Sequence, residues 1–302
     1  MEKKNRWAAF SGNFWIALVL LFIYAPMVYV IIFSFNSSKS LTNFTGFSLQ
    51  WYKRMFTDRT ILQVIYQSVL VTVIATIVST IVGTITAIGL SKSRKIVREL
   101  VLQVNELPVM NPDVVTAIGL MLLFISANIK TSFWTLLIAH ITFCIPYVIL
   151  TIMPKLRQLD DNVAEAALDL GATPWQALTK VIIPQISDAI VSGALIAFSM
   201  SFDDFVISFF TTGTGVSNIS IYVYSMSKRI NPTINAMSTI MMVIVAIILV
   251  VVNLIPVMKE RRSVAAEQSS RKPKAIWKPI VAAVAAAAVL IAVIIPRSEK
   301  EF

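Results

Sequence analysis

The chain has 302 residues, of which 57% are hydrophobic and only 14% are charged. This composition excludes a soluble domain with a polar surface and predicts a protein that has the lipid bilayer as its solvent. The formal net charge is +10, but the Lys and Arg residues lie between apolar runs, which favours membrane topology over nucleic-acid binding. A single cysteine, Cys144, and a single histidine, His140, leave no disulfide framework, cysteine metal site or multi-histidine zinc site.

Seven apolar runs recur along the chain, and most reach the roughly 20 residues that cross about 30 Å of hydrocarbon. They cover residues 14–35, 61–90, 100–124, 133–153, 189–210, 236–258 and 279–295. The first run is too long for the core of a signal peptide and lacks an A-x-A cleavage pattern, so we expect a retained helix. The predicted fold is therefore all-α, a polytopic membrane bundle with six spans in residues 14–258 and a seventh span after them.

The basic residues predict the orientation of this bundle. With residues 1–13 as a cytoplasmic tail, the inner segments carry about twice as many Lys and Arg residues as the outer ones, as the positive-inside rule requires. Residues 296–302 then lie outside the cell. The polar segment 36–60 becomes an outer loop, whose Trp51 and Tyr52 rings are expected to lie at the membrane interface.

The inner loop between the fourth and fifth spans, residues 156–186, contains clear signals for two short helices. Asn162 is the predicted cap of the first helix, with Glu165 as its capping-box partner, and Gly171 supplies the left-handed residue that ends it. Thr173 and Gln176 predict a second capping box. The loop is thus expected to be a helix, turn and helix lying against the membrane. An ordinary amphipathic hairpin at the interface is the alternative interpretation.

A longer motif in this loop bears on that choice. It reads Glu165, Ala166, Ala167, three residues, Gly171, nine residues, then Val181, Ile182, Ile183 and Pro184. This run resembles the EAA loop of inner-membrane permeases of ABC importers, in which the last four positions are usually Ile, any residue, Leu and Pro. The departures at Val181 and Ile183 are conservative in volume and polarity.

The resemblance implies a role for each part of the loop. The hairpin would seat in a groove of a separate cytoplasmic ATPase and move when nucleotide closes the ATPase dimer. Glu165 would be a polar contact or cap, Ala166 and Ala167 a closely packed face, Gly171 the turn, and Pro184 the end of the motif. The chain has no G-x-x-x-x-G-K-[ST] sequence. It is therefore expected to be a non-catalytic subunit without a cofactor, and the partner ATPase would bind ATP and Mg.

Residues 14–258 resemble one branch of this family, the PotC type of spermidine/putrescine permease. The stretches that carry this likeness are Ser34–Ser38, Trp51–Tyr52, Pro112–Asp113, His140–Cys144, Ser201–Asp204 and Ile221–Met226. The resemblance implies a bacterial inner-membrane protein that imports polyamines by alternating access. Its expected partners are a homologous permease, two ATPase subunits and an external substrate-binding protein, with no nucleic acid. Import of another small solute by the same class of permease is the alternative.

Acidic residues inside the apolar runs suit a cationic substrate, because carboxylates in hydrocarbon usually face a cavity or a partner. The candidates are Glu106, Asp113, Asp203 and Asp204. Asp203 and Asp204 are about 100° apart on a helix, so at most one faces the pathway, and the other caps a helix or contacts the sister subunit. Asp113 follows the helix-breaking Pro112, and satisfying freed backbone groups is its alternative role.

Three further residues have a less specific chemistry. Tyr222 and Tyr224 are candidates for contact with a cation or with the binding protein, and interfacial anchoring is the alternative. His140 is expected to be an interhelical hydrogen bonder rather than a ligand.

The sequence continues beyond the family pattern. Residues 259–278 form a basic cytoplasmic linker, and residues 279–295 form an alanine-rich anchor. Residues 296–302 would be an external stub, and we expect the anchor to tether a substrate-binding domain. A plain extra helix is the alternative.

Two rival classes of function remain. An intramembrane aspartyl protease would need Asp113 and Asp204 to face each other, and a structural membrane or channel subunit would need no acidic spans. Neither rival explains the EAA loop.

Overall fold

The computed structural model describes residues 2–40, 42–160, 162–226, 232–247 and 250, with side chains from Phe14 onward. The chain divides into two compact units. One unit is Gln63–Ser225, and the described residues on either side of it belong to the other. Each unit is described by itself.

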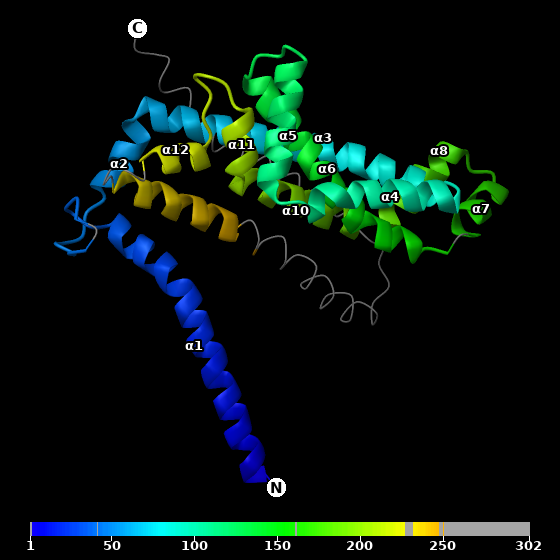
Figure 1. The fold of residues 1–302 in the computed structure, drawn as a ribbon. Coiled ribbons are helices and arrows are strands. Elements are labelled where there is room, and N and C mark those ends of the chain that lie inside the picture. Colours follow the sequence, from blue (N-terminus) through cyan, green and yellow to red (C-terminus); the bar gives the residue numbers. More distant parts are fainter. Residues whose placement is uncertain (1, 41, 161, 227–231, 248–249, 251–302) are drawn as a thin grey trace. The chain divides into compact units, whose positions relative to one another are not determined.

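Three helices are each long and apolar enough to cross a membrane (Figure 1). Helix α1 spans Glu2–Ser34, and its apolar part is Phe14–Ser34. Helix α3 spans Arg59–Ser91, and helix α6 spans Phe133–Arg157. These helices match the first, second and fourth predicted runs within a few residues.

The third predicted run is not one straight span. It consists of α4, Lys95–Met110, and α5, Asp113–Ser126, which are bent by 105° at the break between them. Asn111 ends α4 in an extended conformation with φ −81° and ψ 146°. The ring of Pro112 explains this break, because proline disfavours the α conformation of the residue before it.

The fifth predicted run is also broken. Helix α10 spans Ser187–Asp203, and a second, shorter helix, α11, spans Val206–Thr211. Asp204 between them is extended, with φ −64° and ψ 126°. Before α10, the segment Pro174–Gln185 meets it at an angle of 69°. The hydropathy of the run predicted membrane burial but could not predict the extended residue.

Helix α6 lies at the centre of the core of the Gln63–Ser225 unit. Its buried face, which includes Cys144 and Val148, packs with buried residues of α3, α5, α10 and α11. Gly83 of α3 permits the close approach to α6, because a Cβ there would lie 2.7 Å from Cγ1 of Val148. Small residues at such contacts are the usual means of packing membrane helices without a hydrophobic driving force.

The other unit contains α1, the loop after it, and α2, Gln50–Thr57. Asn36 organises the loop: its Nδ2 donates to the carbonyl oxygens of Ser40 (2.9 Å) and Asn43 (2.8 Å), and its Oδ1 accepts from the backbone of Thr45 (2.9 Å). The indole of Trp51 donates to the carbonyl of Asn36 (2.6 Å) and is only 5% exposed. A hydrogen bond and packing within the chain thus hold the indole, and its expected place at the membrane interface stays a prediction.

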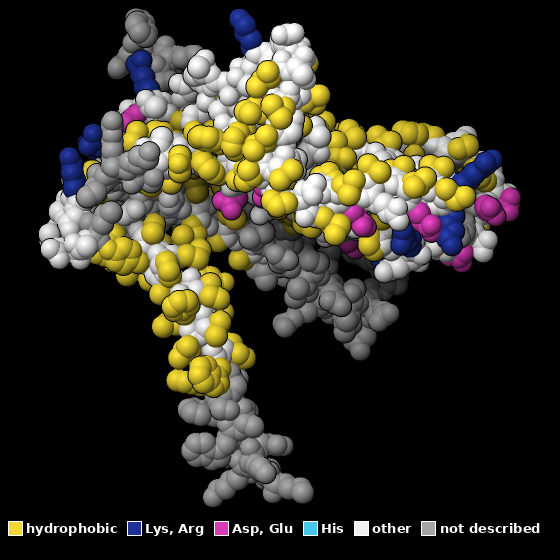
Figure 2. Space-filling model, viewed as in Figure 1, with side chains coloured by type: hydrophobic (Ala, Val, Ile, Leu, Met, Phe, Trp, Pro, Cys, Tyr) yellow, Lys and Arg dark blue, Asp and Glu magenta, His cyan; other side chains and the backbone are white. Residues whose placement is uncertain are grey.

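The described part of α1 has an apolar surface. Most of its large hydrophobic side chains are exposed, among them Trp15, Leu21 and Phe22, and Figure 2 shows them along the helix. Such exposure suits a helix that contacts lipid or another membrane helix.

The C-terminal predictions are only partly covered by the structure. The sixth predicted run begins in a described apolar helix, Thr233–Ile247. The linker 259–278, the seventh run 279–295 and the stub 296–302 lie outside the described residues.

Candidate functional site

The predicted inner loop forms a helix, turn and helix. Its first helix, α7, spans Asn162–Asp169. The carboxylate of Asp160 accepts the backbone N–H of Asn162 at 3.0 Å. The predicted capping box of Asn162 with Glu165 is thus wrong, because Asn162 is already helical. Asp160, a residue type that caps helices equally well, supplies the acceptor at the N-terminus of α7 instead.

The turn after α7 is the one that the glycine predicts. Gly171 has φ +85°, in the left-handed region. Its N–H donates to the carbonyl of Leu168 (2.9 Å), and the N–H of Ala172 donates to the carbonyl of Ala167 (3.0 Å). This pair of bonds is a Schellman motif, which satisfies the last carbonyls of the helix and requires a residue that tolerates positive φ.

The second helix begins with the predicted capping box. The Thr173 N–H donates to Oε1 of Gln176 (3.0 Å), and the Gln176 N–H donates to Oγ1 of Thr173 (3.3 Å). Helix α8, Pro174–Ala177, then continues as a π-helical turn, η1, Leu178–Ile182, and as α9, Ile183–Gln185.

Pro184 of the motif lies in α9 and explains the π turn before it. A proline inside a helix has no N–H to donate, and its ring meets the carbonyl four residues earlier. In the wider turn, the N–H of Ile183 donates to the carbonyl of Leu178, five residues back. The backbone passes the proline without a break, and the bend follows at Ile186.

The inner loop exposes several large apolar side chains. None of the α7 side chains is buried, and Glu165 and Ala166 are exposed while Ala167 is partly covered. Leu168, Leu170 and Trp175 are 42%, 89% and 71% exposed. Sequence reasoning missed these three residues, although large apolar side chains in a loop without a core of its own were a visible signal.

A network of buried polar side chains lies in the Gln63–Ser225 unit, away from the loop. Nδ1 of His140 is 2.8 Å from Oγ of Ser201, and Nε2 is 2.9 Å from Oγ of Ser208. The Ser208 hydroxyl donates to Oδ2 of Asp204 (2.8 Å) and accepts from Nδ2 of Asn218 (2.6 Å). Because this hydroxyl donates to Asp204, it accepts from His140, which places the imidazole proton on Nε2. His140 is thus an interhelical hydrogen bonder, as predicted.

Asp204 and Asp203 have different surroundings. The Asp204 side chain is 6% exposed and caps α11, since its Oδ1 and Oδ2 accept the backbone N–H groups of Ile207 (3.2 Å) and Ser208 (2.7 Å). Asp203 is exposed. Asp204 thus has the capping role. It follows the end of α10 in an extended conformation, so the expected 100° separation of two helical neighbours does not apply to the pair.

The other pathway candidates lie apart from this network. Asp113 is exposed, in the first turn of α5, directly after the 105° break. Tyr222 of α12, Ile219–Met226, is buried, whereas Tyr224 is 50% exposed and its ring lies 4.8 Å from that of Phe205. In the described part of the chain, no group of three His, Cys, Asp or Glu side chains could hold a metal ion.

The sequence was compared with known families and proteins. Residues 79–265 match the family described as the binding-protein-dependent transport system inner membrane component. This match covers more than half of the chain. The chain belongs to this family.

Individual relatives agree with this membership. The chain is 37% identical, over 78% of its length and 91% of the relative's, to the spermidine/putrescine transport system permease protein PotC of Haemophilus influenzae. It is 35% identical to PotC of Escherichia coli K12, over 77% of this chain and 88% of the relative. It is 33% identical to the putrescine transport system permease protein PotI of the same strain, over 76% and 85%. The resemblance to PotC-type permeases is therefore confirmed.

Proposed function

We propose that this chain is the permease subunit of an ATP-driven polyamine importer. Family membership and the spermidine and putrescine permeases among its relatives support this function. The observation that carries it is the structure of the inner loop: Glu165, Ala166 and Ala167 lie on an exposed helix, and this helix ends in a Schellman turn at Gly171.

The loop has the properties of a docking surface for a separate ATPase. Glu165, Ala166 and Ala167 lie on a helix that buries none of its own side chains, and Leu170 and Trp175 project apolar surface beside it. Large exposed apolar groups of this kind mark protein contact sites. ATP and Mg are bound by that partner, so this chain supplies no catalytic group.

The pathway for a cationic substrate is proposed to pass Asp203 and Asp113. Both carboxylates are exposed and lie next to breaks between helices. Broken helices are where membrane transporters commonly bring polar groups to midplane. Tyr224, half exposed beside Phe205, is a candidate for cation–π contact. Asp204 positions the helix break, and Tyr222 packs within the unit.

The remaining assignments follow from the family and from the charge distribution. The loop side of the bundle is proposed to be cytoplasmic, with the N-terminus on that side and the C-terminus outside. The partners are a second, homologous permease subunit, two ATPase subunits and an external binding protein or tethered binding domain.

The test uses the chain with its partner subunits in lipid vesicles, with ATP-dependent accumulation of labelled spermidine and putrescine as the measurement. Gly171→Val and Gly171→Asn are compared. Valine at φ +85° is strained, because left-handed backbone costs L-residues about 1–2 kcal/mol, whereas asparagine tolerates this conformation. We expect uptake to fall sharply in Gly171→Val and to persist in Gly171→Asn.

Co-purification of the ATPase separates the two parts of the proposal. Loss of both uptake and ATPase binding in Gly171→Val, or in Glu165→Ala, supports docking at the loop. An ATPase that binds the intact loop without any uptake of either polyamine would retain the permease and overturn the substrate. Equal uptake by both Gly171 variants would contradict the coupling role of the turn.

A further inference from the structure

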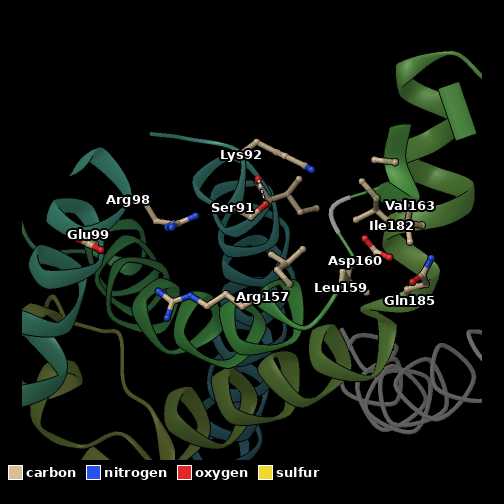
Figure 3. A pocket seen from close by; sticks show the side chains of 13 residues that line it. Ser91, Lys92, Arg98, Glu99, Arg157, Leu159, Asp160, Val163, Ile182 and Gln185 are labelled. Carbon is tan, nitrogen blue, oxygen red and sulfur yellow. Dashed lines mark hydrogen bonds between the residues drawn. The ribbon is translucent and has the colours of Figure 1, made fainter. Parts of the chain in front are cut away.

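A cavity of about 370 Å³ lies between the loop and the ends of the membrane helices, within the Gln63–Ser225 unit. It is open to solvent and is lined by the end of α3, the start of α4, the end of α6, and residues of α7, η1 and α9. Figure 3 shows the polar side chains that converge on it from these elements. None of them belongs to the docking surface or to the pathway proposed above.

Three cationic side chains line the cavity from three different elements. Lys92 follows α3, Arg98 lies in the second turn of α4, and Arg157 is the last residue of α6. No carboxylate in the described part of the chain lies within ion-pair distance of any of them. In addition, Nε of Arg98 is buried and has no hydrogen-bond partner among the described residues. A buried guanidinium nitrogen without an acceptor is costly.

Two carboxylates also line the cavity, but each has a partner elsewhere. Glu99 pairs with Lys95 at 3.9 Å, and Asp160 accepts the N–H of Asn162 as the cap of α7. Figure 3 shows the guanidinium groups of Arg98 and Arg157 on one side of the view and the Asp160 carboxylate on the other. The three cationic side chains outnumber these two carboxylates, and neither carboxylate is within ion-pair distance of them, so the lining keeps a net positive charge.

We propose that this cavity binds a phosphate group. Arginine guanidinium groups bind phosphate through charge-assisted, often bidentate bonds, and basic pockets between the cytoplasmic ends of membrane helices bind anionic headgroups. Ile88, Leu156 and Ile182 line the cavity as well, and they provide apolar contact for the glycerol region of a phospholipid. The phosphate is that of an anionic lipid in the leaflet on the loop side, or free phosphate from solution.

The place of the site gives the anion a structural consequence. Its lining joins Arg98 and Arg157, on helices of the bundle, to Asp160 and Ile182, at both arms of the loop. A bound phosphate relieves the repulsion between the two arginines and fills the space beneath the loop. Occupancy thus stabilises the present position of the loop relative to α4 and α6.

Binding is measured directly, without transport, on the full chain purified with its partner subunits. The complex is placed in phosphatidylcholine nanodiscs with and without phosphatidylglycerol, and bound phosphatidylglycerol is counted by native mass spectrometry. A parallel arm measures radiolabelled inorganic phosphate in nanodiscs of phosphatidylcholine alone. Arg98→Gln is compared with Arg94→Gln, which removes the same charge one turn earlier on an exposed residue outside the cavity.

We expect Arg98→Gln and Arg157→Gln each to weaken binding by roughly fivefold or more, and Arg94→Gln to leave it unchanged. Asp160→Asn provides the opposite change. Asparagine retains the oxygen that caps α7 while removing a negative charge from the cavity, so binding should tighten, which misfolding cannot imitate. Dependence on phosphatidylglycerol identifies a lipid site, and the same variant pattern with inorganic phosphate alone identifies a free-anion site. The proposal would be overturned if the wild type bound neither probe, or if all four variants bound both probes as the wild type does.

Discussion

Replacing Asp204 by alanine should destabilise the membrane bundle far more than replacing its neighbour Asp203. The Asp204 carboxylate is almost fully buried and accepts three hydrogen bonds, from the backbone N–H groups of Ile207 and Ser208 and from the Ser208 hydroxyl. Alanine leaves both N–H groups at the start of α11 without an acceptor. It also removes the carboxylate oxygen to which the Ser208 hydroxyl donates.

The size of the effect follows from these groups. Loss of a side-chain cap costs about 1–2 kcal/mol, and hydrogen bonds to a charged acceptor contribute about 1.5–3 kcal/mol each. Because these terms overlap, we expect a loss of about 3–5 kcal/mol in the free energy of unfolding, the range for removal of one buried partner. Asp204→Asn retains one cap oxygen and should cost less. Asp203→Ala removes an exposed carboxylate and should change stability by about 0.5 kcal/mol or less.

The measurement is SDS-induced unfolding of the purified chain in mixed micelles, followed by circular dichroism, for the three variants and the wild type. The expected order of stability is wild type and Asp203→Ala, then Asp204→Asn, then Asp204→Ala. A loss in Asp204→Ala no greater than in Asp203→Ala would refute the assignment of Asp204 as the cap that holds the helix break.

Two further predictions test the core and the pathway. Gly83→Ala should cost about 1–3 kcal/mol by overpacking against Cβ and Cγ1 of Val148. Gly83→Ala/Val148→Gly, which removes both of these atoms, should cost at least about 0.5 kcal/mol less than the sum of the single changes. Additive costs in the same SDS unfolding assay would show that the two helices do not meet there. Asp203→Asn should lower spermidine uptake in vesicles about fivefold, equivalent to about 1 kcal/mol of attraction at an exposed site, without altering stability. Asp188→Asn, at the other end of α10, is the matched control, and equal uptake by both variants would remove Asp203 from the pathway.

Local chemistry allowed the sequence to predict most of the loop. The Thr173 capping box and the left-handed Gly171 depend on residues within four positions of each other, and both formed as expected. The start of α7 was missed because Asp160 and Asn162, two residues apart, are equally good capping residues by type. In the structure Asp160 is the residue that accepts the helix N–H. Short-range rules therefore predict the kind of turn more securely than its first residue.

The buried network could not be predicted in the same way. Its members are distant in sequence, since His140 bonds to Ser201 and Ser208, 61 and 68 residues away. A hydropathy window registers a serine in an apolar run only as a small reduction of hydrophobicity. It also averages over the extended residues Asn111 and Asp204, which interrupt the helices of two predicted spans. Pairing across helices depends on register and packing, which no single run contains.

The path of the chain joins the loop to the break between α10 and α11, where Asp203 and Asp204 lie. From the Gly171 turn, the backbone runs through α8, η1 and α9, bends at the fully buried Ile186, and continues as α10 to Asp203. The far end of α10 is fixed at Asp204, whose carboxylate caps α11 and contacts the network of His140. A displacement of α8 by a docked ATPase would therefore reach Asp203 along the continuous backbone of these helical segments, rather than through a series of side-chain contacts. Since Asp204 holds α10 and α11 together, we expect such a displacement to move the end of α10 and the start of α11 together. This movement should change the exposure of Asp203.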